Sequence, residues 1–280
     1  TYYVVAHNAN GDDTGFTWGY FVGTMNIGPL RVNDGTGTNI YRFYGVRLNG
    51  VCTSAPSSFS AVNTDFYMQD ATGGINIFQS GLNPNLPALG NDITVCGVLS
   101  QFNGNFEVTT SSSVPTGLTI DINGAGVLPT PLMINSCGDQ ENYEGRLVRM
   151  QFPIADTTGI GPTQAWGSNK TYNLTNCAGS NISLWIDQDC GIPGTPVVSK
   201  QMDVTGIAGQ SDSSSPFDAQ YRISPRGLFD IVYVNTGVSG VQDPFLGQEV
   251  HLLPVNPNPM SSHATIRYEI ARASSPGALS

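Results

Sequence analysis

Runs of alternating apolar and polar residues, separated by glycine, asparagine and aspartate, dominate the chain from residue 41 to residue 110. Alternation with a period of two places successive side chains on opposite faces and predicts β-strands. The same runs are rich in aromatic and β-branched residues, which favour strands. We therefore predict five strands, at residues 41–53, 65–70, 75–79, 92–101 and 105–110.

Short polar segments join these predicted strands as hairpins. Ala71–Gly74 lies between the second and third strands, and its two glycines can supply the positive φ angles of a tight turn. Asn103–Gly104 gives the same signal between the last two strands. Asn49–Gly50 interrupts the alternation of the first strand and predicts a β-bulge. Five short strands that curl back on one another predict a small Greek-key barrel of the OB type.

The pattern recurs in the second half of the chain, which predicts an internal repeat. Ile186–Asp189 repeats the pattern of Met68–Asp70. Met202–Gln210 likewise repeats the pattern of Ile93–Gln101. We therefore predict an all-β chain built from two tandem OB-like Greek-key barrels. The predicted parts are an N-terminal β arm, a first barrel, a second barrel and a Pro-rich tail with a terminal extended strand, at residues 1–40, 41–125, 126–246 and 247–280.

Two stretches resemble known families. Phe66–Ile75, followed by Asp92–Val98, resembles OB-fold modules of secreted bacterial proteins, some of which adjoin extracellular nucleases. Asn256–Pro259, followed by Ala264–Ile270, is similar to the opening of the C-terminal sorting domain of type IX secretion substrates, in which a Pro-Asn-Pro segment precedes a Thr-x-Ile-x-Tyr strand. That sorting domain is a β-sandwich and needs about 100 residues, so only its opening is matched. The resemblances imply the barrel fold and a secreted or cell-surface protein.

The charge of the chain bears on its partners. The net charge is −10, with 11 Lys plus Arg, and charged residues make up only 11% of the chain. Binding to a phosphate backbone needs clustered cations, whereas these are scattered along the sequence, which argues against nucleic acid as a partner. A shared patch of Arg146, Arg149, Arg222 and Arg226 is the alternative to ordinary solvated charges. No apolar run reaches the roughly 18 residues that span a bilayer, so we expect no membrane span.

Five cysteines occur, none in a Cys-x-x-Cys pair, so a zinc ribbon is not expected. The first and fourth strands of an OB barrel are neighbours, and Cys52 and Cys96 lie on these strands, so we predict a disulfide between them. Cys177 and Cys190 flank a predicted strand and pair with each other, or one of them pairs with Cys137. The alternative is that all five are small buried apolar residues.

The sequence contains no motif of a serine hydrolase, a zinc protease or a phosphate-binding loop, so we predict that the protein is not an enzyme and has no cofactor. Ca²⁺ at Asp12–Asp13, or at Asp187 and Asp189, is a weaker alternative to ordinary polar turns. Trp166 and Trp185 are placed in the barrel core or rim, with stacking on a sugar or a base as the alternative.

The predicted function is that of a secreted, non-enzymatic structural protein that assembles into an extracellular filament or surface layer. Ile266, Tyr268 and Ile270 form the apolar face of a strand that follows the Pro254–Pro259 spacer. We expect this strand to pair with the N-terminal arm of another copy, giving a homopolymer; the alternative is that it folds back on its own chain. The alternative function is a carbohydrate- or single-stranded nucleic-acid-binding OB module of a larger secreted hydrolase or nuclease.

Overall fold

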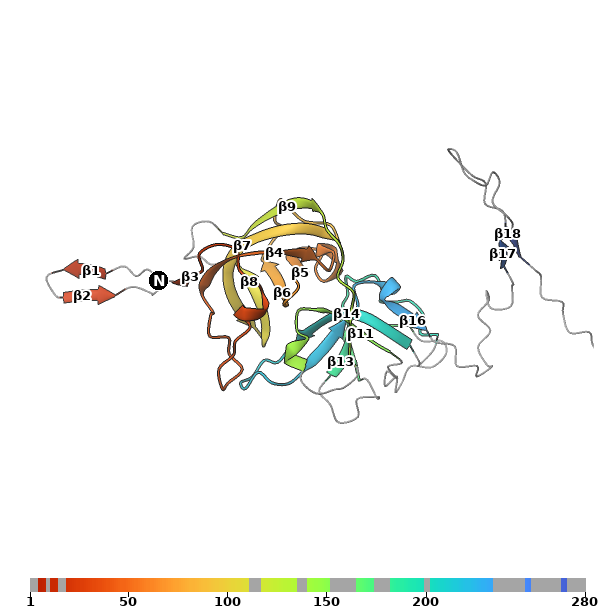
Figure 1. Ribbon diagram of the computed structural model, residues 1–280. Coiled ribbons are helices and arrows are strands. Elements are labelled where there is room, and N and C mark those ends of the chain that lie inside the picture. Colours follow the sequence, from red (N-terminus) through yellow and green to blue (C-terminus); the bar gives the residue numbers. More distant parts are fainter. Residues whose placement is uncertain are drawn as a thin grey trace, which may run out of the picture. The chain divides into compact units, whose positions relative to one another are not determined.

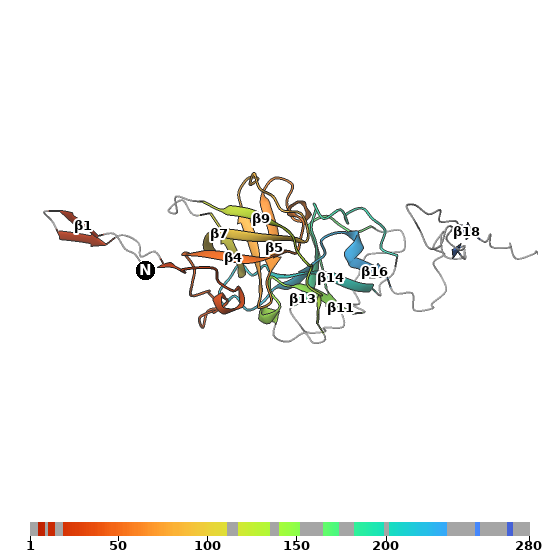
Figure 2. The same cartoon turned by 45° about the horizontal axis from the view of Figure 1, so that its top comes forward.

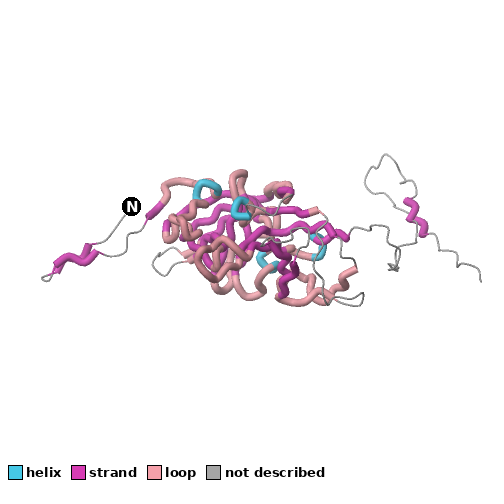
Figure 3. The backbone as a smooth tube through the Cα atoms, turned by 90° about the horizontal axis from the view of Figure 1, so that it is seen from below, coloured by secondary structure: helices cyan, strands magenta, loops and turns pink. Residues whose placement is uncertain are grey.

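The protein is all-β, as the sequence predicted, and the helical turns in its described part are 3₁₀ turns of three residues (Figure 3). The chain divides into two compact units, residues 1–235 and 236–280. This computed structural model describes residues 5–8, 11–14, 19–110, 117–134, 140–151, 165–173, 182–198, 202–233, 250–252 and 268–270.

The first seven-stranded sheet closes on itself and is called barrel 1 (Figures 1 and 2). Its five barrel strands are β4 (Tyr44–Cys52), β5 (Thr64–Gln69), β6 (Gly74–Gln79), β7 (Asn91–Phe102) and β8 (Asn105–Thr109). They pair in the order β4-β5-β6-β8-β7, and β7 pairs again with β4. The β6–β8 pair is parallel and the other pairs of this closed circuit are antiparallel. Two further strands join the sheet: β3 (Gly19–Tyr20) on β4 and β9 (Thr119–Ala125) on β7.

Alternation explains which side chains fill barrel 1. In β4, Val46, Leu48 and Cys52 are buried, whereas Arg47 and Asn49, which flank Leu48, are exposed. The core also takes Ile27 and Leu30, which lie before the first barrel strand. Burial of about ten or more such side chains from strands that are distant in sequence provides the main driving force for closing the sheet.

The two hairpin turns of barrel 1 form by different means. At the β7–β8 turn, Asn103 and Gly104 have φ angles of 51° and 83°, as the sequence predicted. The β5–β6 turn does not use positive φ at Gly73 or Gly74, contrary to prediction. Instead, the Asp70 carboxylate accepts hydrogen bonds from the backbone N–H groups of Thr72, Gly73 and Ile27 at 2.7, 2.8 and 2.8 Å. A side chain therefore closes this turn and also ties the segment before barrel 1 to it.

The predicted bulge at Asn49–Gly50 is absent. Gly45–Val51 of β4 pairs residue for residue with Asp92–Val98 of β7, so the register is continuous there. The interruption lies next to the point where β4 begins to pair with β5, at Val51. A Cβ atom at position 50 would lie 2.7 Å from the Gln69 carbonyl oxygen, so the glycine allows the β5 backbone to come close. The observed irregularity lies between β7 and β9, at Asp92 and Ile93.

The second seven-stranded sheet is called barrel 2 for its strand order; among the described residues its strands follow an open path, without a pair that closes a circuit. Its strands are β10 (Leu132–Met133), β11 (Leu147–Met150), β12 (Lys170–Asn173), β13 (Ile182–Ile186), β14 (Met202–Gln210), β15 (Tyr221–Ser224) and β16 (Ile231–Tyr233). They pair in the order β10-β11-β14-β15-β13-β12, with β16 on β14, and the β13–β15 pair is parallel. The run β11-β14-β15-β13-β12 matches β4-β7-β8-β6-β5 of barrel 1 strand for strand. The two sheets thus share one topology.

Two short antiparallel pairs lie outside the barrels. One joins β1 (Val5–Asn8) to β2 (Gly11–Thr14), near the N-terminus. The other joins β17 (Val250–Leu252) to β18 (Tyr268–Ile270) within the C-terminal unit. Within the predicted assembly strand, Tyr268–Ile270 pairs with Val250–Leu252 of the same chain, and Ile266 lies outside the described residues.

The predicted Cys52–Cys96 disulfide is not formed, and Cys52, Cys96 and Cys190 are free thiols. β4 and β7 are neighbours, but Cys96 lies opposite Arg47, five residues from Cys52 along β4. At about 3.3 Å per residue this offset is far beyond the Cα separation that a disulfide bridges. Cys52 also points into the core, whereas Cys96 is half-buried. Cys137 and Cys177 lie outside the described residues.

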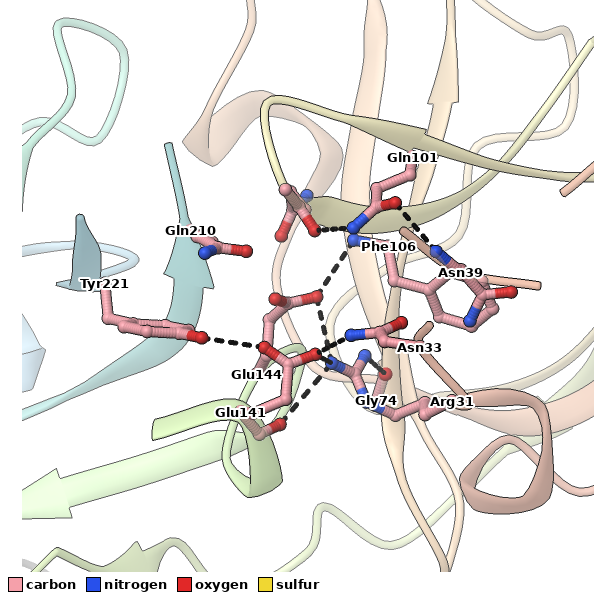
Figure 4. Close-up of polar contacts among 12 residues, drawn as sticks. Arg31, Asn33, Asn39, Gly74, Gln101, Phe106, Glu141, Glu144, Gln210 and Tyr221 are labelled. Carbon is pink, nitrogen blue, oxygen red and sulfur yellow. Dashed lines mark hydrogen bonds and ion pairs between the residues drawn. The ribbon is translucent and has the colours of Figure 1, made fainter. Parts of the chain in front are cut away.

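Arg31 ties the two barrels together through two glutamates (Figure 4). Its guanidinium lies 3.0 Å from Glu144 and 3.5 Å from Glu141, both just before β11, and it donates to the Gly74 carbonyl of β6 at 3.3 Å. Glu144 also accepts a hydrogen bond from the Phe106 N–H at 2.9 Å, so barrel 1 contributes two donors to it. Burial raises the pKa of Glu144, and Arg31 acts in the opposite direction.

Close backbone packing and a small apolar cluster complete the junction. Gly74 and Gly145 lie so close that a Cβ atom on either would overlap the backbone of the other. Tyr67 of β5 packs with Leu147 and Ile207 of barrel 2, and all three are buried. Arg226 of barrel 2 donates to a barrel 1 carbonyl, that of Thr53, at 2.8 Å. The barrels are therefore joined by close backbone packing, apolar contacts and hydrogen bonds, and a larger residue at Gly74 or Gly145 would not fit.

The buried charge pair predicts a strong effect on stability. Arg31→Met leaves the Glu144 carboxylate, 1% exposed, without its cation, and we expect a loss of about 3–5 kcal/mol in the free energy of unfolding. Chemical denaturation measures this loss. The matched control is Arg149→Met, because the Arg149–Asp203 pair has an arginine side chain that is 44% exposed; there we expect about 1 kcal/mol or less.

Removing both members of the buried pair tests whether the unpaired carboxylate causes the loss of stability. If Arg31→Met acts by stranding the carboxylate, the double variant with Glu144→Leu recovers much of the loss. Equal losses for the Arg31 and Arg149 variants would contradict the importance of the pair.

Candidate functional site

The outward face of barrel 2 carries an unusual set of side chains on β12, β13 and β15. Along β13, Ile182, Leu184 and Ile186 are buried, so Ser183 and Trp185 point outward. On the neighbouring strands, Thr171 pairs with Trp185 and Arg222 pairs with Ser183. An aromatic ring, a cation and small hydroxyl side chains thus share one surface.

Arg222 stacks on Trp185 at the centre of this surface. The guanidinium carbon lies 5.0 Å from the centroid of the indole, within the range of a cation–π interaction. The pair borders a cavity of about 370 Å³, which we call the Trp185 cavity. Six of its eight lining residues have polar side chains: the lining is Thr171, Asn173, Ile182, Ser183, Trp185, Ser211, Gln220 and Arg222. A planar ring beside hydrogen-bonding groups suits a flat ligand that has polar edges.

Acidic groups lie beside this arginine and set its local field. Burial raises the pKa values of Asp65, on β5 of barrel 1, and Asp187, just after β13, while Arg222 lowers both. The indole N–H of Trp185 donates to Asp187 at 3.4 Å. Arg222 is therefore partly compensated by carboxylates, so the site lacks the strong positive potential of a phosphate-binding groove.

Glu107 extends this acidic region along barrel 1. It lies on β8 opposite Asn76, whose amide donates to Asp65 at 2.8 Å. Burial raises the pKa of Glu107 to about 7, Ser100 lowers it through a hydrogen bond, and Asp65 raises it further. Barrel 1 thus contains a buried carboxyl group whose pKa lies near neutral pH.

Two hydrogen-bond links hold the strands of the Trp185 cavity. Asn169, before β12, donates to the Gln188 side chain at 3.0 Å and accepts from its backbone N–H at 3.1 Å, joining the ends of β12 and β13. Tyr221, beside Arg222 on β15, donates to Glu141 at 2.8 Å. Glu141 also contacts Arg31, so the junction between the barrels supports the strand that carries Arg222.

The tryptophans and aspartates that the sequence suggested as ligand-binding candidates lie in different environments. Trp166 is 2% exposed, and its indole N–H donates to the Tyr233 hydroxyl at 3.0 Å, so the prediction that it belongs to the core is confirmed. Trp185 is half-buried and points outward, which agrees with the predicted rim position and also with the alternative that it stacks on a ligand. Asp187 accepts a hydrogen bond from the backbone N–H of Asp189, as a turn residue does. Asp189 instead accepts from the backbone N–H of Ala61 in barrel 1, at 3.1 Å.

The suggested arginine patch does not form around Arg222. Arg149 pairs with Asp203, and Arg226 pairs with Asp230 at 2.7 Å. Arg146 donates to the Thr72 carbonyl. Arg222 alone of the four lines the Trp185 cavity.

The described residues contain no cluster of three or more His, Cys, Asp or Glu side chains arranged for a metal ion. None of their helices has both the length and the apolar character needed to cross a bilayer. Asp12 and Asp13 are in β2, and their side chains lie outside the description.

Comparison with known proteins identifies one relative. Over 197 residues the chain is 34% identical to the endonuclease YhcR of Bacillus subtilis (strain 168). The match covers 66% of this chain but only 14% of that relative, so the chain spans a small part of its length. No protein-family model matches the chain.

This similarity corrects the functional prediction. The expectation of a protein unrelated to any enzyme is contradicted, because the matched protein is named an endonuclease. The filament and homopolymer predictions gain no support from the structure or the similarity. The alternative prediction, a binding module of a larger nuclease, agrees better with the match.

The buried carboxyl group of Glu107 predicts that the free energy of unfolding depends on pH. The pKa of Glu107 is about 7 in the folded protein and 4.5 ordinarily, so the folded state binds the extra proton between these pH values. The stability contributed by this group is complete below about pH 4.5 and is lost as pH rises through about 7. Glu107→Gln removes the loss, so the variant gains about 1–3 kcal/mol relative to the unaltered chain between pH 5 and pH 8. Urea denaturation at a series of pH values measures this; parallel profiles for the two proteins would contradict the assignment.

Proposed function

We propose that this chain is the nucleic-acid-binding region of a secreted endonuclease, and that it holds a single-stranded segment on the outer face of barrel 2. The observation that carries the proposal is the stack of Arg222 on the outward-pointing Trp185, beside a polar cavity. The similarity to an endonuclease supports the choice of nucleic acid as the ligand. The polar, charge-poor composition of the chain supports secretion.

The topology supports the same face as the binding surface. The strand order shared by the two barrels, with parallel third and fifth strands, agrees with an OB-type Greek-key barrel. OB barrels bind oligonucleotides on the face of their second and third strands. In barrel 2 these strands are β12 and β13, which carry Thr171, Ser183 and Trp185. The proposed surface therefore coincides with the one that this architecture favours.

The charge of the chain determines the kind of binding that we expect. Stacking of a base on an aromatic ring contributes about 1–3 kcal/mol and does not depend on the sequence of the ligand. The net charge of −10 and the carboxylates near Arg222 oppose a large electrostatic contribution. We therefore propose binding that is dominated by stacking, with an affinity in the micromolar range or weaker and little preference among bases.

A titration with a fluorescent single-stranded oligonucleotide tests this function. We expect Trp185→Ala to weaken binding about 5- to 100-fold, because the base loses its stacking partner, and Trp185→Phe to have an intermediate effect. With one or two phosphates contacted, the logarithm of the affinity should fall with the logarithm of salt concentration with a slope of about −0.7 to −1.4.

The control is Phe102→Ala, which removes another exposed aromatic ring, 67% exposed, from a position that does not line the Trp185 cavity. Equal binding by the unaltered chain and Trp185→Ala would contradict the proposal. Binding of a neutral oligosaccharide in place of the oligonucleotide, lost in Trp185→Ala, would instead assign the same face to carbohydrate.

A further inference from the structure

A second cavity lies on barrel 1, at the edge formed by β3, β4 and β7. It has a volume of about 340 Å³ and we call it the Tyr20 cavity. Its lining consists of Tyr20, Phe21, Gly23, Gly45, Val46, Arg47, Cys96 and Gly97. None of these residues is on the strands that form the Trp185 cavity, so the two cavities are separate features of the protein.

Tyr20 is held at this cavity by a reciprocal packing of tyrosine and glycine. In the parallel β3–β4 pair, Tyr20 lies opposite Gly45, and Gly19 lies opposite Tyr44. Each tyrosine ring occupies the space that a side chain at the opposite glycine would need. Tyr20 nevertheless remains 42% exposed, so part of its ring is available to a ligand. The ring is thus positioned in advance, which lowers the entropic cost of stacking on it.

The wall of the cavity is fixed by hydrogen bonds to β4. The N–H groups of Phe21 and Met25 donate to the carbonyls of Gly45 and Arg47 at 3.0 and 2.8 Å. Between these two bonds, Gly23 has a φ angle of 85° and no other atoms near its missing side chain. The segment therefore bows away from β4 at a position where a glycine is needed, and it leaves space beside the tyrosine.

Arg47 supplies an uncompensated charge at the same place. It is exposed on β4, opposite Cys96 of β7, and forms no ion pair within the described part of the chain. Arg31, Arg149 and Arg226 by contrast are each held by carboxylates. A free guanidinium next to an available aromatic ring offers the two contacts that a nucleotide unit needs: one for the base and one for the phosphate.

We propose that the Tyr20 cavity is a second nucleotide-binding site, at which a base stacks on Tyr20 and the adjoining phosphate pairs with Arg47. This inference rests on the proposed function and extends it to barrel 1. A strand that engages both cavities gains affinity from two weak sites, because the second contact is intramolecular.

Four variants of the full chain test the site by the oligonucleotide titration. Tyr20→Ala and Arg47→Gln each weaken binding, the first by at least about fivefold, and Tyr20→Phe, which keeps the ring, binds within about twofold of the unaltered chain. Phe102→Ala is the control and leaves binding unchanged. Thermal unfolding of each variant is measured alongside, and only variants that keep the unfolding temperature are compared.

Cys96 provides an independent readout, because this half-buried thiol lines the cavity whereas Cys52 and Cys190 are buried. We expect saturating oligothymidylate to slow alkylation of Cys96 severalfold, as followed by peptide mass spectrometry. In Tyr20→Ala the oligonucleotide should no longer protect Cys96. The protection persists in Trp185→Ala at a higher oligonucleotide concentration.

The outcomes separate the two proposals. Unchanged binding by Tyr20→Ala and Arg47→Gln, together with unprotected Cys96, overturns the second site. If Trp185→Ala still weakens binding in that case, the proposed function stands. If Tyr20→Ala loses binding while Trp185→Ala binds as well as the unaltered chain, the result supports the Tyr20 cavity and contradicts the site on barrel 2.

Discussion

The structure depends on the buried carboxylate of Glu144. At the junction of the barrels this group is 1% exposed, and desolvation of its charged form would be costly without Arg31 at 3.0 Å. Its Oε1 atom contacts Arg31 and the Phe106 N–H, both from barrel 1 or the segment before it, whereas Glu144 itself leads into barrel 2. Through Glu141, the same network reaches Tyr221, beside Arg222. A polar pair that contributes little to net stability can therefore specify how the barrels pack and where the Trp185 cavity lies.

Much of barrel 1 could be predicted because its strands alternate strongly and its turns are short. The predicted strands at 65–70 and 92–101 match β5 and β7 to within one residue at each end. Register was beyond reach, since it depends on how separate strands align. Cys52 and Cys96 show this: adjacency of their strands was predicted correctly, yet the pairing sets Cys96 opposite Arg47. The β5–β6 turn was predicted at the right place, but its closure by Asp70 involves Ile27, which is distant in sequence.

Only part of the candidate site could be predicted from the sequence. The pattern Ile-Ser-Leu-Trp-Ile over Ile182–Ile186 already places Trp185 on the face opposite to Leu184, so its outward position could have been read from the alternation. Its stack with Arg222 could not, because β13 and β15 become neighbours only through the parallel pairing of strands separated by β14. The relation to a nuclease was predicted only as the alternative function, for another reason. Lack of a catalytic motif was taken as evidence against an enzyme, whereas a binding region of a nuclease needs no such motif.

The placement of the cations reconciles an acidic chain with an anionic ligand. Several described cations lie over aromatic rings: Arg31 over Phe106, Arg42 over Phe43, Lys170 over Tyr172, Arg222 over Trp185 and Arg226 over Phe229. A ring behind a guanidinium fixes its plane, so that its donors point in set directions. Recognition by such pairs acts over contact distance, whereas a field from net charge acts over about 8–10 Å at physiological salt. An overall negative charge then repels nucleic acid at long range but does not prevent local stacking. The proposed binding therefore rests on specific contacts at few positions rather than on a basic groove, which favours weak and readily reversible association with a strand.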